Sequence, residues 1–100
     1  MSTVEETLAR IQNHPGVLGY IIINSDGAAV RRFGMDLEEV ARYSQLIMNL
    51  AAQGRSAVRD LDPRNDLNFI RIRSNKHEIM IAPEIDYTLV VIQDPTAEAV

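Results

Sequence analysis

The sequence has no cysteine and no tryptophan, and only 5% of its residues are aromatic. Without cysteine, neither a disulfide framework nor a thiolate metal site can form, and we expect an intracellular compartment. No apolar run approaches the roughly 20 residues that span a bilayer, so membrane insertion is not expected. Residues 1–6 lack the cationic start and apolar stretch of a secretory signal, so no export is expected.

What is present suits one compact domain over residues 1–100. Hydrophobic residues make up 46% and charged residues 24%, a mixture typical of globular proteins. The net charge is -4, with a pI near 5.0. Binding to a phosphate backbone needs a basic surface, so nucleic acid is not an expected partner.

The first third of the chain predicts a helix and a hairpin. Thr3 to Glu6 form a capping box, and helical spacing of apolar residues then predicts a helix over Val4–Asn13. The β-branched run Val17–Ile23 predicts a strand. A turn ending at Gly27, where a positive φ is expected, leads to a second, less buried strand over Ala28–Phe33.

A long helix is predicted next, beginning after the Asp36 cap and extending towards Leu61. Gly54 costs about 1 kcal/mol relative to alanine inside a helix. A break there, followed by a short strand over Ser56–Asp60, is therefore the main alternative. Asp62-Pro63 should end either version.

Three more strands are predicted over Leu67–Ser74, His77–Ala82 and Tyr87–Gln93. Short links make them antiparallel neighbours. The runs Val17–Ile23, Ile79–Ile81 and Leu89–Ile92 are apolar on both faces, so they belong inside the sheet, with the Ala28 and Leu67 strands at its edges. The predicted fold is α/β: a five-stranded antiparallel sheet in α-β-β-α-β-β-β order, with helices on both faces. The tail Pro95–Val100 is too short for a substantial third helix.

Side chains with chemical potential give no recognisable active site. His14 and His77 lack the spacing and the third ligand of a zinc site, and no serine lies in a nucleophile motif. Asp60, Asp62 and Asp66 lack the glycine and terminal glutamate of a calcium loop, and Pro63 interrupts them. The glycines are too dispersed for a phosphate loop. We expect no enzyme activity, no cofactor and no metal.

Two features predict association between copies. Arg71 and Arg73 alternate with isoleucines and should project from one strand face, either towards partner carboxylates or as solvated charges that discourage aggregation. The apolar stripe of the long helix is wider than one sheet face requires. We therefore expect a homodimer in which edge strands pair and long helices pack across a two-fold axis. The expected interface comprises Tyr43, Ile47, Leu50, Leu67, Phe69, Ile70, Arg71, Ile72 and Arg73.

Several segments in register resemble the roadblock family of cytoplasmic and axonemal dynein light chains. They are VEETL from Val4, GYIIIN from Gly19, RDLDP from Arg59, DLNFIRIR from Asp66 and EIMIAP from Glu78. The resemblance spans nearly the whole chain, although no single segment is catalytic or unique. It implies an α/β homodimer that binds the dynein intermediate chain, in the cytoplasm on the cytoskeleton or in a ciliary or flagellar axoneme.

Two functional hypotheses follow. In the first, the dimer is a non-catalytic light chain, and Val4, Leu8 and Ile11 on the first helix contact a helical segment of the intermediate chain. In the second, the protein regulates or scaffolds a small GTPase, because distant bacterial relatives of the fold include GTPase-activating polarity proteins. An arginine finger is not obvious in the sequence, but an activator can instead reposition residues of its target.

Overall fold

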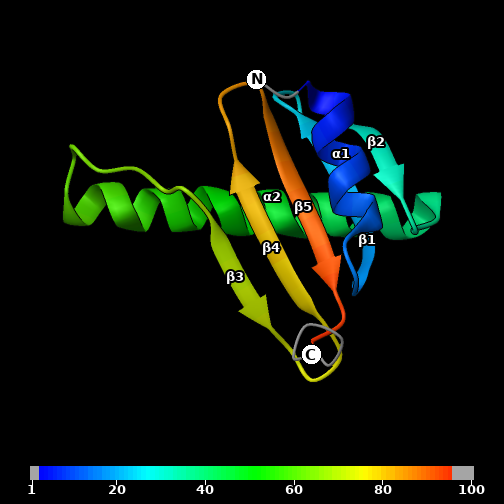
Figure 1. The fold of residues 1–100 in the computed structure, drawn as a ribbon. Coiled ribbons are helices and arrows are strands. Elements are labelled where there is room, and N and C mark those ends of the chain that lie inside the picture. Colours follow the sequence, from blue (N-terminus) through cyan, green and yellow to red (C-terminus); the bar gives the residue numbers. More distant parts are fainter. Residues whose placement is uncertain (1–2, 96–100) are drawn as a thin grey trace.

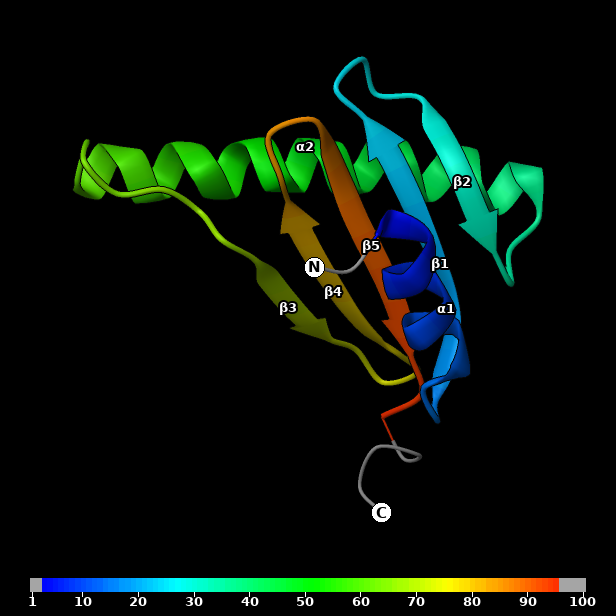
Figure 2. The same ribbon diagram turned by 45° about the horizontal axis from the view of Figure 1, so that its top comes forward.

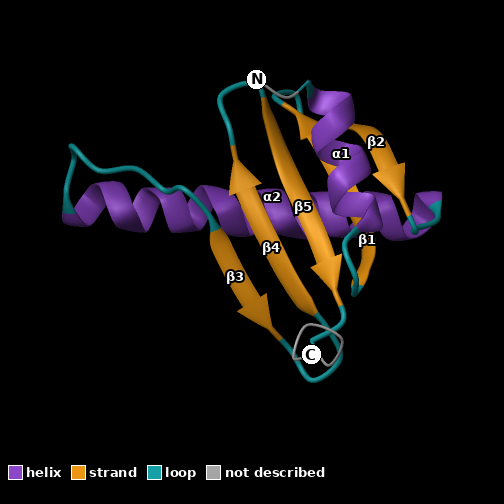
Figure 3. Cartoon of the chain, in the orientation of Figure 1, coloured by secondary structure: helices purple, strands orange, loops and turns teal. Residues whose placement is uncertain are grey.

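The computed structural model describes residues 3–95 as two helices and five strands (Figure 1, Figure 3). The predicted α-β-β-α-β-β-β order is confirmed. Of the predicted tail, all but Pro95 lies outside the described residues. The elements are α1 (Val4–Asn13), β1 (Val17–Asn24), β2 (Ala29–Phe33), α2 (Leu37–Leu61), β3 (Ile70–Arg73), β4 (Glu78–Pro83) and β5 (Tyr87–Gln93).

The strands form one antiparallel sheet in the order β2-β1-β5-β4-β3. The most apolar strands are therefore inside, and the two mixed strands are at the edges, as predicted. The two helices lie on opposite faces of the sheet (Figure 2). We call the face covered by α2 the inner face and the face covered by α1 the outer face.

Both helices begin at the predicted caps. Thr3 Oγ1 accepts a hydrogen bond from the Glu6 amide at 3.1 Å, and Asp36 forms a complete capping box with Glu39. Helix α2 is continuous through Gly54, so the alternative break is wrong. A Cβ at Gly54 would lie 3.1 Å from Ile70 Cδ1 and 3.5 Å from Leu67 Cδ2. The absence of a side chain at Gly54 lets the segment that leads into β3 lie close to α2.

Alternate residues of the same strands build two separate cores. On the inner face, side chains such as Ile21, Ile81 and Val90 are fully buried against α2. On the outer face, Leu8 of α1 packs with Tyr20, Ile22 and Val91. Because α1 is only 10 residues long, it leaves β3 and much of β4 uncovered on that side (Figure 1).

Strand β3 is shorter than predicted, because residues 67–69 do not join the sheet. The ladder pairs Ile70 with Ile81, so Asn68 would come opposite Pro83 if it continued. Proline has no amide hydrogen to donate to a neighbouring strand. The segment instead follows α2, with Leu67 close to Gly54.

Candidate functional site

One candidate surface lies along a flank of α2 that the sheet does not cover. Successive residues lie about 100° apart around a helix, so a residue directly before a buried one lies on the flank of the buried side. The buried residues Val40, Ser44, Ile47 and Ala51 face the inner core, whereas Leu46 is 64% exposed and Leu50 is 37% exposed. The end of α2 also extends past the β3 edge in both ribbon views (Figures 1 and 2), with Leu61 at its exposed tip.

The β3 edge lies beside this part of α2. As the outermost strand, β3 pairs with β4 alone among the described strands, so one of its backbone edges is open. Ile70 and Ile72 are half-buried and pack towards α2, and Phe69 just before the strand is 58% exposed. An open strand edge next to exposed apolar side chains is a template for pairing with a second chain.

Eight of the nine predicted interface residues have surface that a partner could contact. Tyr43, Leu67, Ile70 and Ile72 are half-buried, and Leu50, Phe69, Arg71 and Arg73 are exposed, so each has surface at the α2 flank or around β3. Ile47 is different. Only 6% of it is exposed, because it belongs to the inner core, and it has little surface left for a partner.

A second candidate surface is a groove of about 410 Å³ on the outer face, beside α1. Its apolar lining comes from the end of α1 and from three strands: Ile11, Val17, Met80, Leu89 and Val91. Its polar lining is Arg10, His14, Arg71 and Gln93.

Two buried polar side chains lie at or next to this groove: Gln93 lines it, and Glu78 pairs with the lining residue Arg71. Glu78 is buried on β4, where its Oε1 accepts hydrogen bonds from Arg71 Nε at 2.9 Å and Nη2 at 2.5 Å. Gln93 is 7% exposed, and its Oε1 is buried without a hydrogen-bond partner. An unsatisfied buried acceptor is uncommon in a folded domain, and it distinguishes the Gln93 end of the groove from the rest of the lining.

The residues predicted to bind a partner through α1 are placed differently from one another. Ile11 is half-buried and lines the groove, and Val4 is 51% exposed at the start of the helix. Leu8 is only 4% exposed and lies in the outer core. A partner therefore has little of Leu8 to contact, and a charge placed there would damage the fold first.

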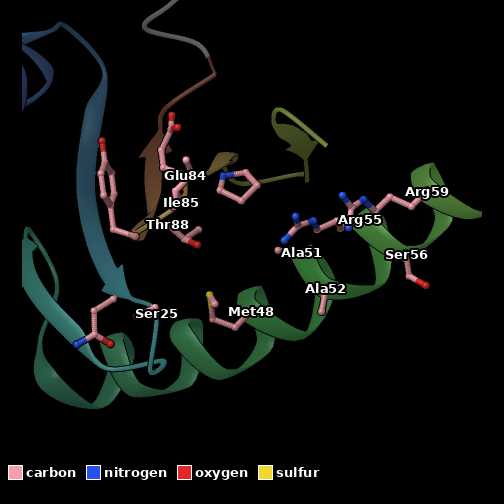
Figure 4. A pocket seen from close by; sticks show the side chains of 13 residues that line it. Ser25, Met48, Ala51, Ala52, Arg55, Ser56, Arg59, Glu84, Ile85 and Thr88 are labelled. Carbon is pink, nitrogen blue, oxygen red and sulfur yellow. The ribbon is translucent and has the colours of Figure 1, made fainter. Parts of the chain in front are cut away.

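A third surface is a cavity of about 510 Å³ at one end of the sheet, which the sequence did not reveal. It lies between α2, the turn after β1 and the β4–β5 turn, and its lining includes Met48, Arg55, Arg59, Glu84 and Ile85 (Figure 4). Three segments far apart in the chain form it. The sequence hint of this surface was Ile85, an isoleucine in a polar turn. In the structure its side chain is 96% exposed.

An ion pair supports the helix side of this cavity. Arg55 Nε donates to Asp66 Oδ1 at 2.9 Å, and Nη2 donates to Oδ2 at 3.1 Å. The Leu67 amide also donates to Asp66 Oδ1, at 2.8 Å. That backbone hydrogen bond, followed by Arg55, lowers the pKa of Asp66 below its usual value. The pair fastens the loop after α2 to the helix.

Residues 3–95 hold no group of three or more histidine, cysteine, aspartate or glutamate side chains able to bind a metal ion. His14 Nδ1 lies 3.0 Å from the carbonyl oxygen of Pro15, and His77 is on the β3–β4 turn. Neither described helix is long and apolar enough to cross a bilayer.

The sheet order and the two helices define an α/β sandwich with exposed apolar surfaces on α2, at the β3 edge and beside α1. A model of the Roadblock/LC7 domain matches residues 3–94, and the chain belongs to this family. The resemblance found in the sequence is thereby confirmed at the level of the domain family. The match by itself does not identify a dynein light chain.

Several solved structures with the same fold are of bacterial proteins. The Roadblock/LC7 domain from Streptomyces avermitilis superposes with a TM-score of 0.81 at 18% identity, covering 92% of this chain and 78% of that one. The gliding protein MglB from Thermus thermophilus gives 0.75 at 13% identity, covering 97% and 78%. Myxococcus xanthus MglB gives 0.70 at 15% identity, covering 91% and 72%. At these identities the likeness establishes the fold.

Proposed function

We propose that the protein is a non-catalytic homodimer that binds a small GTPase and regulates its nucleotide state. The carrying observation is the similarity to two MglB structures over 91% and 97% of the chain. MglB-like relatives act as GTPase regulators. The sequence offers no nucleophile or acid-base set of its own, so the protein would act by repositioning residues of its target.

Dimerisation is the first part of this proposal. Pairing of two β3 edges would satisfy the open backbone groups and make one continuous sheet. The same two-fold axis would bring together the α2 flanks that carry Leu46 and Leu50. Two copies would thus bury both apolar surfaces at once, which supports a single interface made of helix and strand.

The end cavity is the second part, and we place the GTPase there. Leu46 and Leu50 on the dimer flank are each two positions from Met48, which lines the cavity, so the cavity lies on the other side of α2. Ile85 would be the apolar anchor, and Arg59 would contribute a charge beside it. A projecting apolar side chain beside a cavity could fill a pocket on the partner, and a few such buried anchors supply much of the binding energy of an interface.

The test measures GTP hydrolysis by small GTPases of the source organism, with and without the purified dimer, in single turnovers. We expect a change of at least about tenfold for one of them. Ile85→Asp should remove most of the change, whereas Val4→Asp, at another exposed apolar position on the outer side, should keep it. A hydrolysis rate that no tested GTPase changes, together with no binding in either nucleotide state, would refute the proposal.

Binding of the dynein intermediate chain is the second candidate function. The segments that resemble dynein light chains favour it, and Val4 and Ile11 of α1 would contribute the contact. Recovery of intermediate chain by the wild-type dimer, reduced by Ile11→Asp and unchanged by Ile85→Asp, would select this candidate. The reverse pattern, with a GTPase recovered, would select the first.

A further inference from the structure

A further hollow lies where the first turns of α2 pass beside β2 (Figure 1). It has a volume of about 540 Å³. Sites for small ligands commonly measure roughly 300 to 1,000 Å³. Seven of its nine lining residues come from α2, on the side of the helix away from Leu46 and Leu50, and the other two are Gly27 and Ala29. We call it the α2–β2 hollow.

A β-bulge keeps the β2 side of this hollow open. Strand β1 pairs Ile22 with Arg31 but Ile23 with Ala29, so the ladder passes over Val30. A regular ladder would place Val30 opposite Ile23, which belongs to the inner core. The bulge places the smaller Ala29 there instead, and Val30 is 56% exposed. Bulges are over-represented beside functional sites.

The hydroxyl of Ser44 has no role in the fold that the structure shows. Ser44 lines the hollow and is 6% exposed, and its Oγ is buried with no hydrogen-bond partner among residues 3–95. A hydroxyl inside a helix often donates to the carbonyl one turn back, as Thr7 Oγ1 does to the Thr3 oxygen at 3.1 Å. Leaving a buried hydroxyl unpaired costs stability. Rotation about one bond would turn this donor and acceptor towards an occupant.

The lining restricts the chemistry of that occupant. All nine lining residues are uncharged, so a charged ligand would lose hydration without gaining an opposite charge. Val40 and Met48 supply apolar walls. Gln45 and Asn49, which are exposed and one turn apart, add neutral amides. The hollow therefore suits an uncharged molecule that is mostly apolar.

We propose that the α2–β2 hollow binds a small uncharged molecule with an aliphatic body and a hydroxyl group. The body would lie against Val40 and Met48, and the hydroxyl would form a hydrogen bond with Ser44. The inference goes beyond the proposed function and does not depend on it. The hollow includes neither Ile85 of the end cavity nor Leu46 of the dimer flank.

Methyl NMR on the full-length protein, with cyclohexanol as the probe, tests the location. Met48 lines both the hollow and the end cavity, whereas Leu37 lines the hollow alone and Ile85 reports the end cavity. We expect saturable shifts of the Met48 and Leu37 methyl resonances, with a dissociation constant below about 5 mM, and none at Ile85. Shifts that do not saturate, or that include Ile85 without Leu37, would overturn the proposal.

Two further probes test the expected neutrality of the ligand. Cyclohexylammonium and cyclohexanecarboxylate keep the ring of cyclohexanol but carry a positive and a negative charge at neutral pH. Each should bind about tenfold more weakly than cyclohexanol, or worse, because the lining offers no opposite charge. Equal or tighter binding of either ion would contradict the assigned ligand class.

Ser44→Ala separates a hydroxyl that binds a ligand from one that supports the fold. The variant should bind cyclohexanol about fivefold more weakly. Without the probe it should melt at the same temperature as wild type or higher, since an unpaired buried hydroxyl has been removed. Ser56→Ala, at an exposed serine of α2 outside the hollow, should leave affinity within about twofold. Unchanged affinity in Ser44→Ala, or a clearly lower melting temperature, would refute the role of Ser44 and the proposal with it.

Filling the hollow gives a test that does not use Ser44. Ala41 is exposed and lines the hollow, so a phenylalanine at this position should occupy the space at little cost to the fold. Ala41→Phe should therefore abolish the shift at Met48. Ala9→Phe, at an exposed alanine of α1, is the matched control and should keep it. Cyclohexanol binding of equal strength in both variants would show that the probe lies elsewhere.

Discussion

The two faces of the sheet are both apolar in sequence but are covered by helices of very different length. Helix α2 has 25 residues and α1 has 10. Nine buried residues form the inner core, and four form the outer core. Unequal covering therefore decides which surfaces stay exposed: the flank and end of a long helix on the inner side, and open sheet on the outer side.

The largest difference between the faces should appear on neighbouring residues of β1. Ile21 is completely buried in the inner core, and Ile22 is 6% exposed in the outer core. Ile21→Ala should cost about 4 kcal/mol of unfolding free energy and Ile22→Ala about 2, because the inner site is enclosed and cannot collapse around the cavity. Urea denaturation measures both. Equal losses would mean that the two layers are packed equally well.

The next effect concerns the second copy that we propose to pair with the β3 edge and the α2 flank. Leu46→Asp or Phe69→Asp should raise the dimer dissociation constant about a hundredfold, because each places a charge in the proposed interface. Leu37→Asp is the control. Leu37 is 70% exposed on α2, but it lines a separate hollow that includes neither Leu46 nor Leu50. Analytical ultracentrifugation would report the masses. A dimer unaffected by both interface variants would show that the association uses another surface.

The sequence predicted the layers more reliably than the binding surfaces. Strand periodicity and caps depend on nearby residues, so the element order, the continuous sheet and its edges could all be predicted. Leu8 and Ile47 show the limit, because an apolar residue at a helical position looks the same whether it faces a core or a partner. The end cavity could not be predicted, since Met48, Arg59 and Ile85 meet only after folding.

A smaller effect is expected from the polar strip of the outer face. Arg71→Ala should cost about 1 to 2 kcal/mol, because it removes the guanidinium that donates to buried Glu78. Arg73→Ala, on the same strand face, should cost much less. Adding Glu78→Gln to Arg71→Ala should recover part of the loss. Thermal unfolding of the three variants would measure this, and an equal cost for both arginines would show that Glu78 does not depend on Arg71.

The smallest effect lies at the end of the inner layer, where Arg55 and the Leu67 amide hold Asp66. Its pKa is lower in the folded chain, so its contribution is fully present above the usual aspartate range and is lost as pH falls through the folded pKa. Asp66→Asn should therefore be slightly less stable than wild type near neutral pH and equal to it in strong acid. Because Asp66 is exposed, salt should reduce the difference. A difference that grows on acidification would mean that the ionised carboxylate destabilises this loop.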